Sequence, residues 1–184
     1  MIDDERIIEL FFERSEEAIQ ELGNKYGKAC HKLSYNIVNN RQDAEECVND
    51  AYLGVWNAIP PHRPNPLSVF VCKIVRNISI MRYRANTALK RNSNYDSTME
   101  ELENCLSSSV SVEDSLEEKE LIAIIEDFLR DLSQENRVIF LRRYWFSDSY
   151  AEIAALTEKN VSVRLSRIRK QLQTHLAERG VLAC

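Results

Sequence analysis

The stretch YAEIAALTEKNVSVRLSRIRKQL, residues 150–172, contains two helical patterns with little chain between them. In the second pattern, Val161, Leu165, Ile168 and Leu172 recur at spacings of four, three and four residues, which places them on one helix face. Four basic side chains lie off that face: Arg164, Arg167, Arg169 and Lys170. The spacing therefore predicts a helix with a buried apolar stripe and a basic outer surface.

A shorter helix is expected just before it. Ser149 and Glu152 have the Ser-x-x-Glu spacing of a capping box, which marks a helix start. Two short helices in succession are typical of a helix-turn-helix, whose turn takes about 3–4 residues. We expect the turn to use Ala154–Leu156, released by fraying of the first helix, with Thr157 capping the second helix. The alternative is a pair of helices that run on with a kink.

Composition favours an all-helical protein. Hydrophobic residues make up 44% of the 184 residues and charged residues 29%, with only four Gly and four Pro. There is no apolar run long enough for a membrane span, and the acidic N-terminus is unlike a signal peptide. We therefore expect a cytoplasmic protein without membrane insertion.

Catalytic and metal-binding patterns are absent from the sequence. The five Cys form no C-x-x-C pair and the three His have no ligand spacing, so we expect neither a zinc site nor a disulfide framework. There is also no Gly-rich phosphate loop and no H-E-x-x-H motif. The sequence predicts a protein that is not an enzyme and has no cofactor or metal.

Charge is divided into blocks. Residues 60–92 hold seven basic side chains and no acidic one, and residues 137–184 hold nine basic and four acidic ones. Between them, residues 93–136 carry thirteen acidic side chains and two basic ones. Two basic blocks separated by an acidic segment suggest two contact sites for one polyanion.

Hydrophobic periodicity predicts four helices in the first half, over residues 4–22, about 26–38, about 41–59 and about 67–90. The loop PPHRPNP, residues 60–66, contains all four prolines and should be ordered but not helical. The core face predicted for the fourth helix consists of Leu67, Phe70, Val71, Ile74, Ile78 and Met81.

The predicted organisation is all-α, with two small helical bundles. The bundles cover residues 1–91 and 117–184, and the second contains the helix-turn-helix. Residues 92–116 are rich in Ser, Asn and acidic residues, which predicts a linker with at most a short helical turn around Met99–Cys105.

Two segments carry a family resemblance. DAEECVNDAYLGVWNAIPP with LSVFVCKIVRNISIMRYR resembles the second conserved region of bacterial RNA polymerase sigma factors. LSQENRVIFLRRYWFSDSYAEIAALTEKNVSVRLSRIRKQL is similar to their fourth region. Having only these two regions resembles the extracytoplasmic-function (ECF) group. The chain departs from the family pattern at Met81, where an acid is common, and in its turn, which is shorter.

The resemblance implies a specificity subunit that binds core RNA polymerase and promoter DNA. Its contacts on the polymerase would be the β′ clamp and the β flap, and an anti-sigma factor is a further candidate partner. The residues that it assigns to the clamp are Asp43, Glu46, Asp50 and Asn57. Their acidic character fits a basic partner.

Promoter contacts follow from the same resemblance. Residues assigned to the −10 element, where a base is unstacked and captured, are Arg63, Asn65, Lys73, Arg76, Asn77, Arg82 and Arg84. Those assigned to base reading at the −35 element are Lys159, Asn160, Ser162, Val163, Arg164, Ser166 and Arg167. Arg142 and Arg143 are expected to contact phosphate there.

Two other functions remain open from the sequence. A stand-alone helix-turn-helix regulator would need neither the acidic face nor the Pro-rich loop. A polymerase-binding protein with a degenerate DNA reader would be consistent with the short turn.

Overall fold

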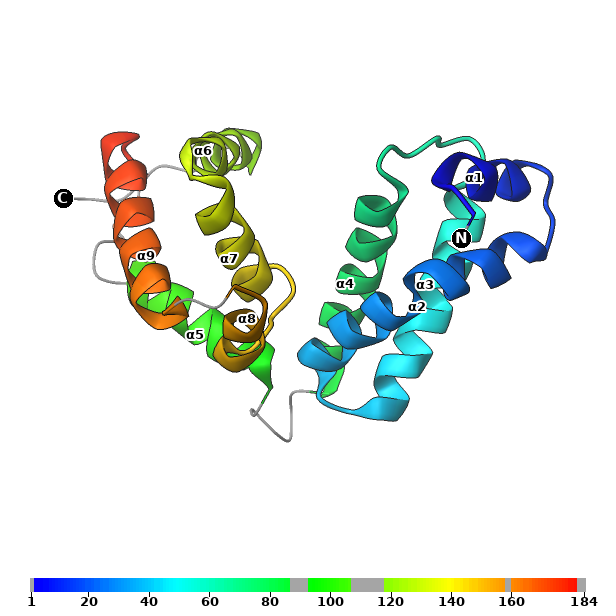
Figure 1. Ribbon diagram of the computed structural model, residues 1–184, viewed down its shortest axis with the longest axis horizontal. Helices are drawn as coiled ribbons and strands as arrows, with labels where there is room; N and C mark the ends of the chain where they lie inside the picture. Colours follow the sequence, from blue (N-terminus) through cyan, green and yellow to red (C-terminus); the bar gives the residue numbers. More distant parts are fainter. Residues whose placement is uncertain (1, 87–92, 107–117, 158–159, 182–184) are drawn as a thin grey trace. The chain divides into compact units, whose positions relative to one another are not determined.

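The computed structural model describes residues 2–86, 93–106, 118–157 and 160–181. The chain divides into two compact units, Met1–Tyr95 and Asp96–Cys184. Throughout the described ranges the secondary structure is helical and contains no strand, which confirms the predicted all-α class (Figure 1). No helix within these ranges is long and apolar enough to cross a membrane.

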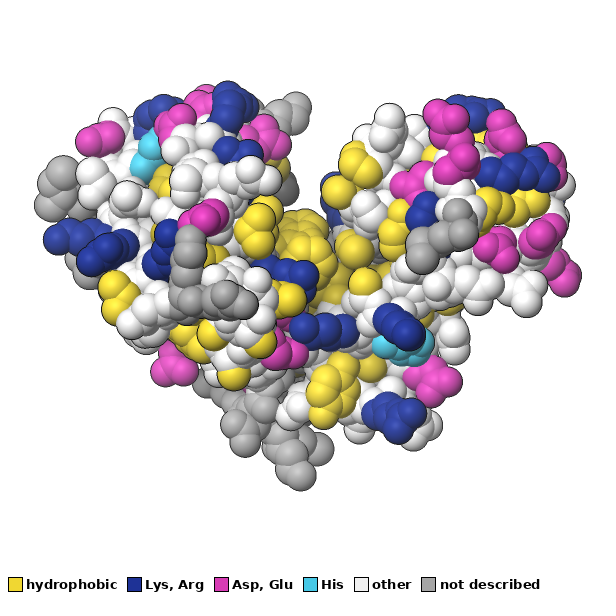
Figure 2. Space-filling model, viewed as in Figure 1, with side chains coloured by type: hydrophobic (Ala, Val, Ile, Leu, Met, Phe, Trp, Pro, Cys, Tyr) yellow, Lys and Arg dark blue, Asp and Glu magenta, His cyan; other side chains and the backbone are white. Residues whose placement is uncertain are grey.

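The first unit is built on three long helices that pack against one another: α2 (Glu17–Val38), α3 (Arg41–Ala58) and α4 (Leu67–Asn86). A short helix, α1 (Asp4–Phe12), packs on α2. Figure 2 shows acidic side chains gathered over α1 and the start of α2, as expected from the acidic N-terminal sequence. The core of this unit therefore lies between α2, α3 and α4.

The predicted helix over residues 4–22 is wrong, because the chain breaks between α1 and α2. Arg14 takes a left-handed conformation with φ of 56° and ends the first helical segment. Its Nη1 donates a hydrogen bond of 2.7 Å to the carbonyl oxygen of Trp56, and its guanidinium lies over the Trp56 ring. These long-range contacts stabilise a break that local periodicity does not indicate.

The predicted gap between residues 22 and 26 is also wrong, since α2 continues through it. Gly27 faces Tyr52 of α3, and a Cβ atom on this glycine would lie 3.3 Å from the Tyr52 Oη. Glycine here permits close packing of α2 on α3 and does not end the helix. The predicted junction at Asn39–Asn40 is confirmed: Asn39 is left-handed, and the Asn40 side chain caps α3.

Helix α4 is rotated relative to the predicted core face. Its buried residues are Leu67, Val71, Cys72, Val75 and Ser79. Met81, predicted to be in the core, is 70% exposed. The position of Ser79 explains the rotation, because its hydroxyl is hydrogen-bonded to the buried Ser34 hydroxyl of α2 at 2.8 Å. A polar pair inside the core is invisible to a pattern that counts only apolar residues.

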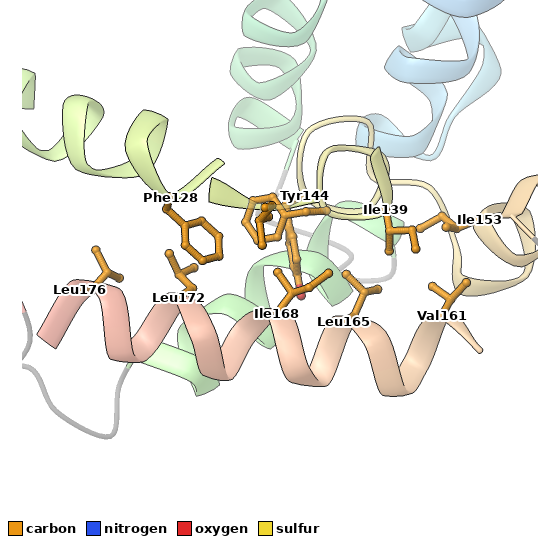
Figure 3. Packing of buried hydrophobic residues seen from close by; sticks show 11 residues of the cluster. Phe128, Ile139, Tyr144, Ile153, Val161, Leu165, Ile168, Leu172 and Leu176 are labelled. Carbon is orange, nitrogen blue, oxygen red and sulfur yellow. The ribbon is translucent and has the colours of Figure 1, made fainter. Parts of the chain in front are cut away.

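The second unit contains five helices in the described part of the chain: α5 (Asn94–Leu106), α6 (Glu118–Asp131), α7 (Gln134–Tyr144), α8 (Tyr150–Thr157) and α9 (Val161–Glu178). The first two residues of α5 fall in the first unit. The predicted apolar stripe of α9 is confirmed. Its side chains point into a core formed with Phe128, Ile139, Tyr144 and Ile153 (Figure 3). The buried stripe comprises Val161, Leu165, Ile168, Leu172 and Leu176.

Helix α5 lies where we expected a linker. It spans 13 residues, more than the short turn predicted around Met99–Cys105. Thr98 and Cys105 are buried, and Leu102 and Leu106 pack against the core of the second unit. Few apolar residues mark the helical period in this segment, which is rich in Ser, Asn and acidic residues. Its composition therefore indicated a linker and not a helix. The rest of the predicted linker, residues 107–116, lies outside the described residues.

Candidate nucleic-acid and protein interfaces

The helix pair of the opening sequence is formed by α8 and α9. The predicted capping box is confirmed: the Ser149 backbone N–H donates to Glu152 Oε2 at 2.8 Å, and the Glu152 N–H donates to Ser149 Oγ at 3.3 Å. Helix α8 then continues through Thr157, whose hydroxyl donates to the Ile153 carbonyl at 2.9 Å. Thr157 therefore belongs to α8, and the prediction that it caps the next helix is wrong.

The break between the two helices comes later than predicted, because α8 ends at Thr157 and α9 begins at Val161. Asn160 caps α9 by accepting a hydrogen bond from the Val163 N–H at 3.3 Å. Residues 158–159, which include the predicted DNA contact Lys159, lie outside the described residues. Helix α8 does not fray, because Ala155 and Leu156 remain helical, and the pair is not one continuous kinked helix, because Asn160 is a non-helical cap with φ of -71° and ψ of 85°. Ile153 and Val161 are buried in one cluster, so α9 keeps its packing partner.

The outer surface of α9 is polar and open. Arg167 is exposed on the side away from the buried stripe, and so is Lys170, which the sequence analysis placed off the stripe but did not assign to DNA. Its spacing of three residues from Arg167 places it on the same surface. Lys and Arg side chains stand out along the outer edge of α9 in Figure 2. The other predicted −35 residues that are exposed here are Asn160, Ser162, Val163 and Ser166.

Three predicted arginines are held by acidic partners. Arg164 is half-buried, with Nη2 3.0 Å from Oε2 of Glu135 on α7. Arg142 Nη1 lies 3.0 Å from Oδ2 of Asp148, a carboxylate that is 1% exposed. Arg143 differs most from expectation.

We expected Arg143 on the surface, but its side chain is 3% exposed. Its Nη2 donates to Glu101 Oε1 at 2.5 Å, its Nη1 donates to the Asp148 carbonyl at 3.0 Å, and its guanidinium lies over the Tyr150 ring. The prediction of an open, phosphate-facing side chain is therefore wrong.

Arg169 is a structural residue that the sequence prediction did not assign. Its Nη1 donates to the hydroxyl of Tyr144 at 2.9 Å, to that of Tyr150 at 3.3 Å and to Glu101 Oε2 at 3.2 Å. Burial acts to lower the pKa of Arg169, but the tyrosine hydrogen bonds outweigh it and raise the pKa. Burial also raises the pKa of Tyr144, to about 12. Arg169 therefore stays charged and connects α9 to α5, α7 and α8.

The predicted clamp-binding residues share one face of α3. Glu46, Asp50 and Asn57 are exposed and Asp43 is half-buried. Leu53 lies between Asp50 and Asn57 on this face and is 58% exposed. Positions 46, 50, 53 and 57 have the spacing of one helix face, so the periodicity that placed the acidic residues there could also have identified Leu53. We call this set of five side chains the α3 face.

Arg82 lies against the α3 face, although it was predicted to contact the −10 element. Its Nη2 is 2.8 Å from Glu46 Oε2, and its Nη1 is 3.7 Å from Asp43 Oδ1. Asn86 Nδ2 also donates to Asp43 Oδ2 at 3.0 Å. The end of α4 thus partly offsets the negative charge at the start of α3.

The Pro-rich loop is ordered and not helical, as predicted. The guanidinium of Arg63 lies 4.2 Å from the centre of the Phe12 ring, and His62 stacks on Phe70. Arg63 and Asn65 are exposed. These contacts hold the loop against α1 and α4.

The remaining −10 candidates lie along α4. Lys73, Asn77 and Arg84 are exposed, and Val69 and Met81 extend the same helix face with apolar side chains. Arg76 differs, because its guanidinium lies over the Tyr95 ring and burial lowers its pKa. The exposed α4 face can offer cations to a phosphate backbone and apolar surface to an unstacked base.

In the described ranges, no three His, Cys, Asp or Glu side chains cluster in a way that could hold a metal ion. Cys30, Cys47, Cys72 and Cys105 are buried free thiols.

Comparison with protein families gives two matches. The family model for Sigma-70 region 2 matches residues 22–88, which include α3 and α4. The model for Sigma-70, region 4 matches residues 122–172, which include α7, α8 and most of α9. Together the two matches cover more than half of the chain. No curated protein matches it.

Proposed function

The chain belongs to the ECF group of sigma factors, which bind RNA polymerase and direct promoter-specific initiation, and we propose that the α3 face is its main contact with the core enzyme. The partner surface would be the clamp of the polymerase β′ subunit. On this proposal the first unit also engages the −10 element through the Pro-rich loop and α4. The second unit engages the −35 element through α9.

The composition of the α3 face is the observation that carries the proposal. Asp50 and Glu46 provide negative charge at the surface, and the exposed Leu53 provides an apolar centre beside them. An apolar centre with a polar rim is the common arrangement of a protein–protein interface. Acidic side chains favour a basic partner and steer its approach.

Promoter contacts are proposed from exposure. On α9, Asn160 and Arg167 are exposed and carry groups that can form paired hydrogen bonds with adenine and guanine. On α4, the exposed side chains of Lys73, Asn77 and Arg84 suit a single strand near an unstacked base. Because Arg164 and Arg142 are engaged by carboxylates, we give them a secondary place.

Three further parts of the proposal concern partners and activity. The second unit would contact the β flap, and exposed Val138 and Leu156 on α7 and α8 support an apolar contact there. An anti-sigma factor would compete with the polymerase by covering the α3 face. The chain would act in the cytoplasm, where core polymerase works, and would contribute binding without catalysis of its own.

The proposal is tested by titrating fluorescently labelled chain with core polymerase. Asp50→Arg should weaken binding by more than about tenfold, because a like charge faces a basic partner at a close interface. Glu45→Arg is the matched control, since Glu45 is exposed on α3 but lies off the α3 face. Equal affinity of wild type and Asp50→Arg would rule out this contact.

A further inference from the structure

Helix α5 contributes a half-buried carboxylate to the contacts between helices of the second unit. Glu101 accepts hydrogen bonds from Arg143 at 2.5 Å and 3.3 Å, from Arg169 at 3.2 Å and from the Tyr144 hydroxyl at 3.2 Å. Arg143 belongs to α7 and Arg169 to α9. One side chain from α5 therefore joins two helices of the DNA-reading unit.

The burial of Arg143 makes this carboxylate important. A guanidinium that is 3% exposed has lost most of its hydration, so it needs a counter-ion and hydrogen-bond acceptors. Glu101 supplies both. Removing one partner from a buried pair leaves the other charge uncompensated, which is far more costly than losing a surface pair.

Other contacts hold α5 along α9. The Cys105 Sγ donates to the Arg169 carbonyl at 3.5 Å, and the Gln173 side-chain amide donates to the Cys105 carbonyl. Leu102 and Leu106 pack on the apolar core. Cys105 is only 8% exposed, so protection of its thiol from solvent reports whether α5 is docked.

We propose that Glu101 is a positioning residue for promoter reading. Through Arg143 and Arg169 it fixes α9 relative to α7, so that the outer surface of α9 is presented in one orientation. Glu101 lies outside the region 4 match at residues 122–172, which means that the DNA-reading unit begins upstream of that match. The inference rests on the proposed role of α9 at the −35 element.

The first test measures α5 docking in the free, full-length chain. Cys105 is labelled with a thiol reagent under native conditions, and the label is located by mass spectrometry. Glu101→Gln should raise the labelling rate by about tenfold, because the buried Arg143 then lacks its counter-ion. Glu103→Gln removes the same charge from the exposed side of α5 and should stay within about twofold of wild type.

A second variant keeps the test decisive if Glu101→Gln disturbs the whole unit. Arg169→Gln leaves Arg143 paired with Glu101 and should raise labelling by about threefold. Wild-type labelling rates in both variants would overturn the proposal. No polymerase or DNA is present in this assay, so its result is independent of the proposed promoter contacts.

The positioning role is tested with reconstituted holoenzyme. For Glu101→Gln, the promoter concentration giving half-maximal initiation should rise about fivefold on an intact −35 element, while the maximal rate stays unchanged. On a promoter with a scrambled −35 element, variant and wild type should be equal. An equal loss on both promoters, or a loss confined to the maximal rate, would overturn the positioning role.

Discussion

Arg82 on α4 and Glu46 on α3 form an ion pair, with 2.8 Å between Nη2 and Oε2. The pair lies on the α3 face and brings a positive charge to a surface that we propose meets a basic partner. Both side chains remain partly exposed, so the pair itself adds little to stability. The pair instead makes the α3 face less negative and so reduces its charge complementarity to a basic partner.

Loss of Arg82 is therefore expected to favour polymerase binding. Arg82→Gln should tighten binding to core by about twofold at low salt, because the α3 face becomes more negative, and the gain should fade as salt rises. Affinity titrations at two salt concentrations and an open-complex assay measure the effect. Unchanged core affinity with about tenfold less promoter opening would contradict this prediction and show that Arg82 contacts the −10 element.

Promoter discrimination should separate Arg167 from Lys170. We expect Arg167→Ala to reduce binding by about 1–3 kcal/mol on the preferred −35 sequence only, because base contacts carry specificity. Lys170→Ala should weaken all sequences equally and reduce the slope of log affinity against log salt by about 1, as for a phosphate contact. Holoenzyme titrations against a −35 library test both, and a uniform effect of Arg167→Ala would contradict a base-reading role.

The core of the second unit should depend on Leu165. This side chain is completely buried, so Leu165→Ala should cost about 2–5 kcal/mol of unfolding free energy for that unit. The fluorescence of Trp145, in a Trp56→Phe background, reports the unfolding of the second unit in urea. Val163→Ala on the exposed side of α9 is the control, expected within about 0.5 kcal/mol of its parent. Similar losses in the two variants would argue against the packing described.

The first unit should lose stability in acid through Asp4. Burial alone would raise the pKa of Asp4, but hydrogen bonds from Lys25 and Tyr26 outweigh it and hold the pKa below its usual 3.8. A depressed pKa in the folded state means that this stabilisation is present above pH 3.8 and is lost as pH falls through the folded value.

Asp4→Asn should accordingly cost about 0.5–1 kcal/mol near neutral pH, and the difference from wild type should shrink in acid. Unfolding followed by Trp56 fluorescence, in a Trp145→Phe background, measures this difference in unfolding free energy. Glu5→Gln, in the same helical turn but exposed, is the control. A difference that stays constant down to pH 2 would contradict the assignment.

Local patterns predicted the parts of the fold that local interactions determine. The stripe of α9 and the Ser149–Glu152 capping box depend on residues three or four apart, and the structure confirms both. The Asn39–Asn40 junction is likewise a local feature. Periodicity in a single segment is sufficient for such elements.

The features that sequence reasoning missed depend on distant partners. Arg143 is buried because Glu101, 42 residues earlier, supplies its counter-ion. Arg14 breaks the first helix through a bond to Trp56, also 42 residues away. The short turn was misplaced for a different reason: α8 keeps its last residues helical, and the Asn160 cap was not recognised.

The candidate site residues also differ in how far local sequence predicts them. Helical spacing was enough to place Glu46, Asp50 and Asn57 on one face and to expose Arg167 on α9. Side-chain pairing was not predictable, so Arg82 and Arg143 were assigned to DNA although each is held by a carboxylate.

Transcription by reconstituted holoenzyme tests the central claim, that the α3 face recruits polymerase while α9 directs it to promoters. Core enzyme with wild-type chain should produce transcripts from promoters whose −35 element is intact, with far fewer from scrambled ones. Asp50→Arg should abolish transcripts from every promoter, whereas Arg167→Ala should remove the preference for the −35 element and leave core binding intact. Undiminished, promoter-specific transcription with Asp50→Arg, or specific promoter binding by the free chain at physiological salt without core enzyme, would contradict the account.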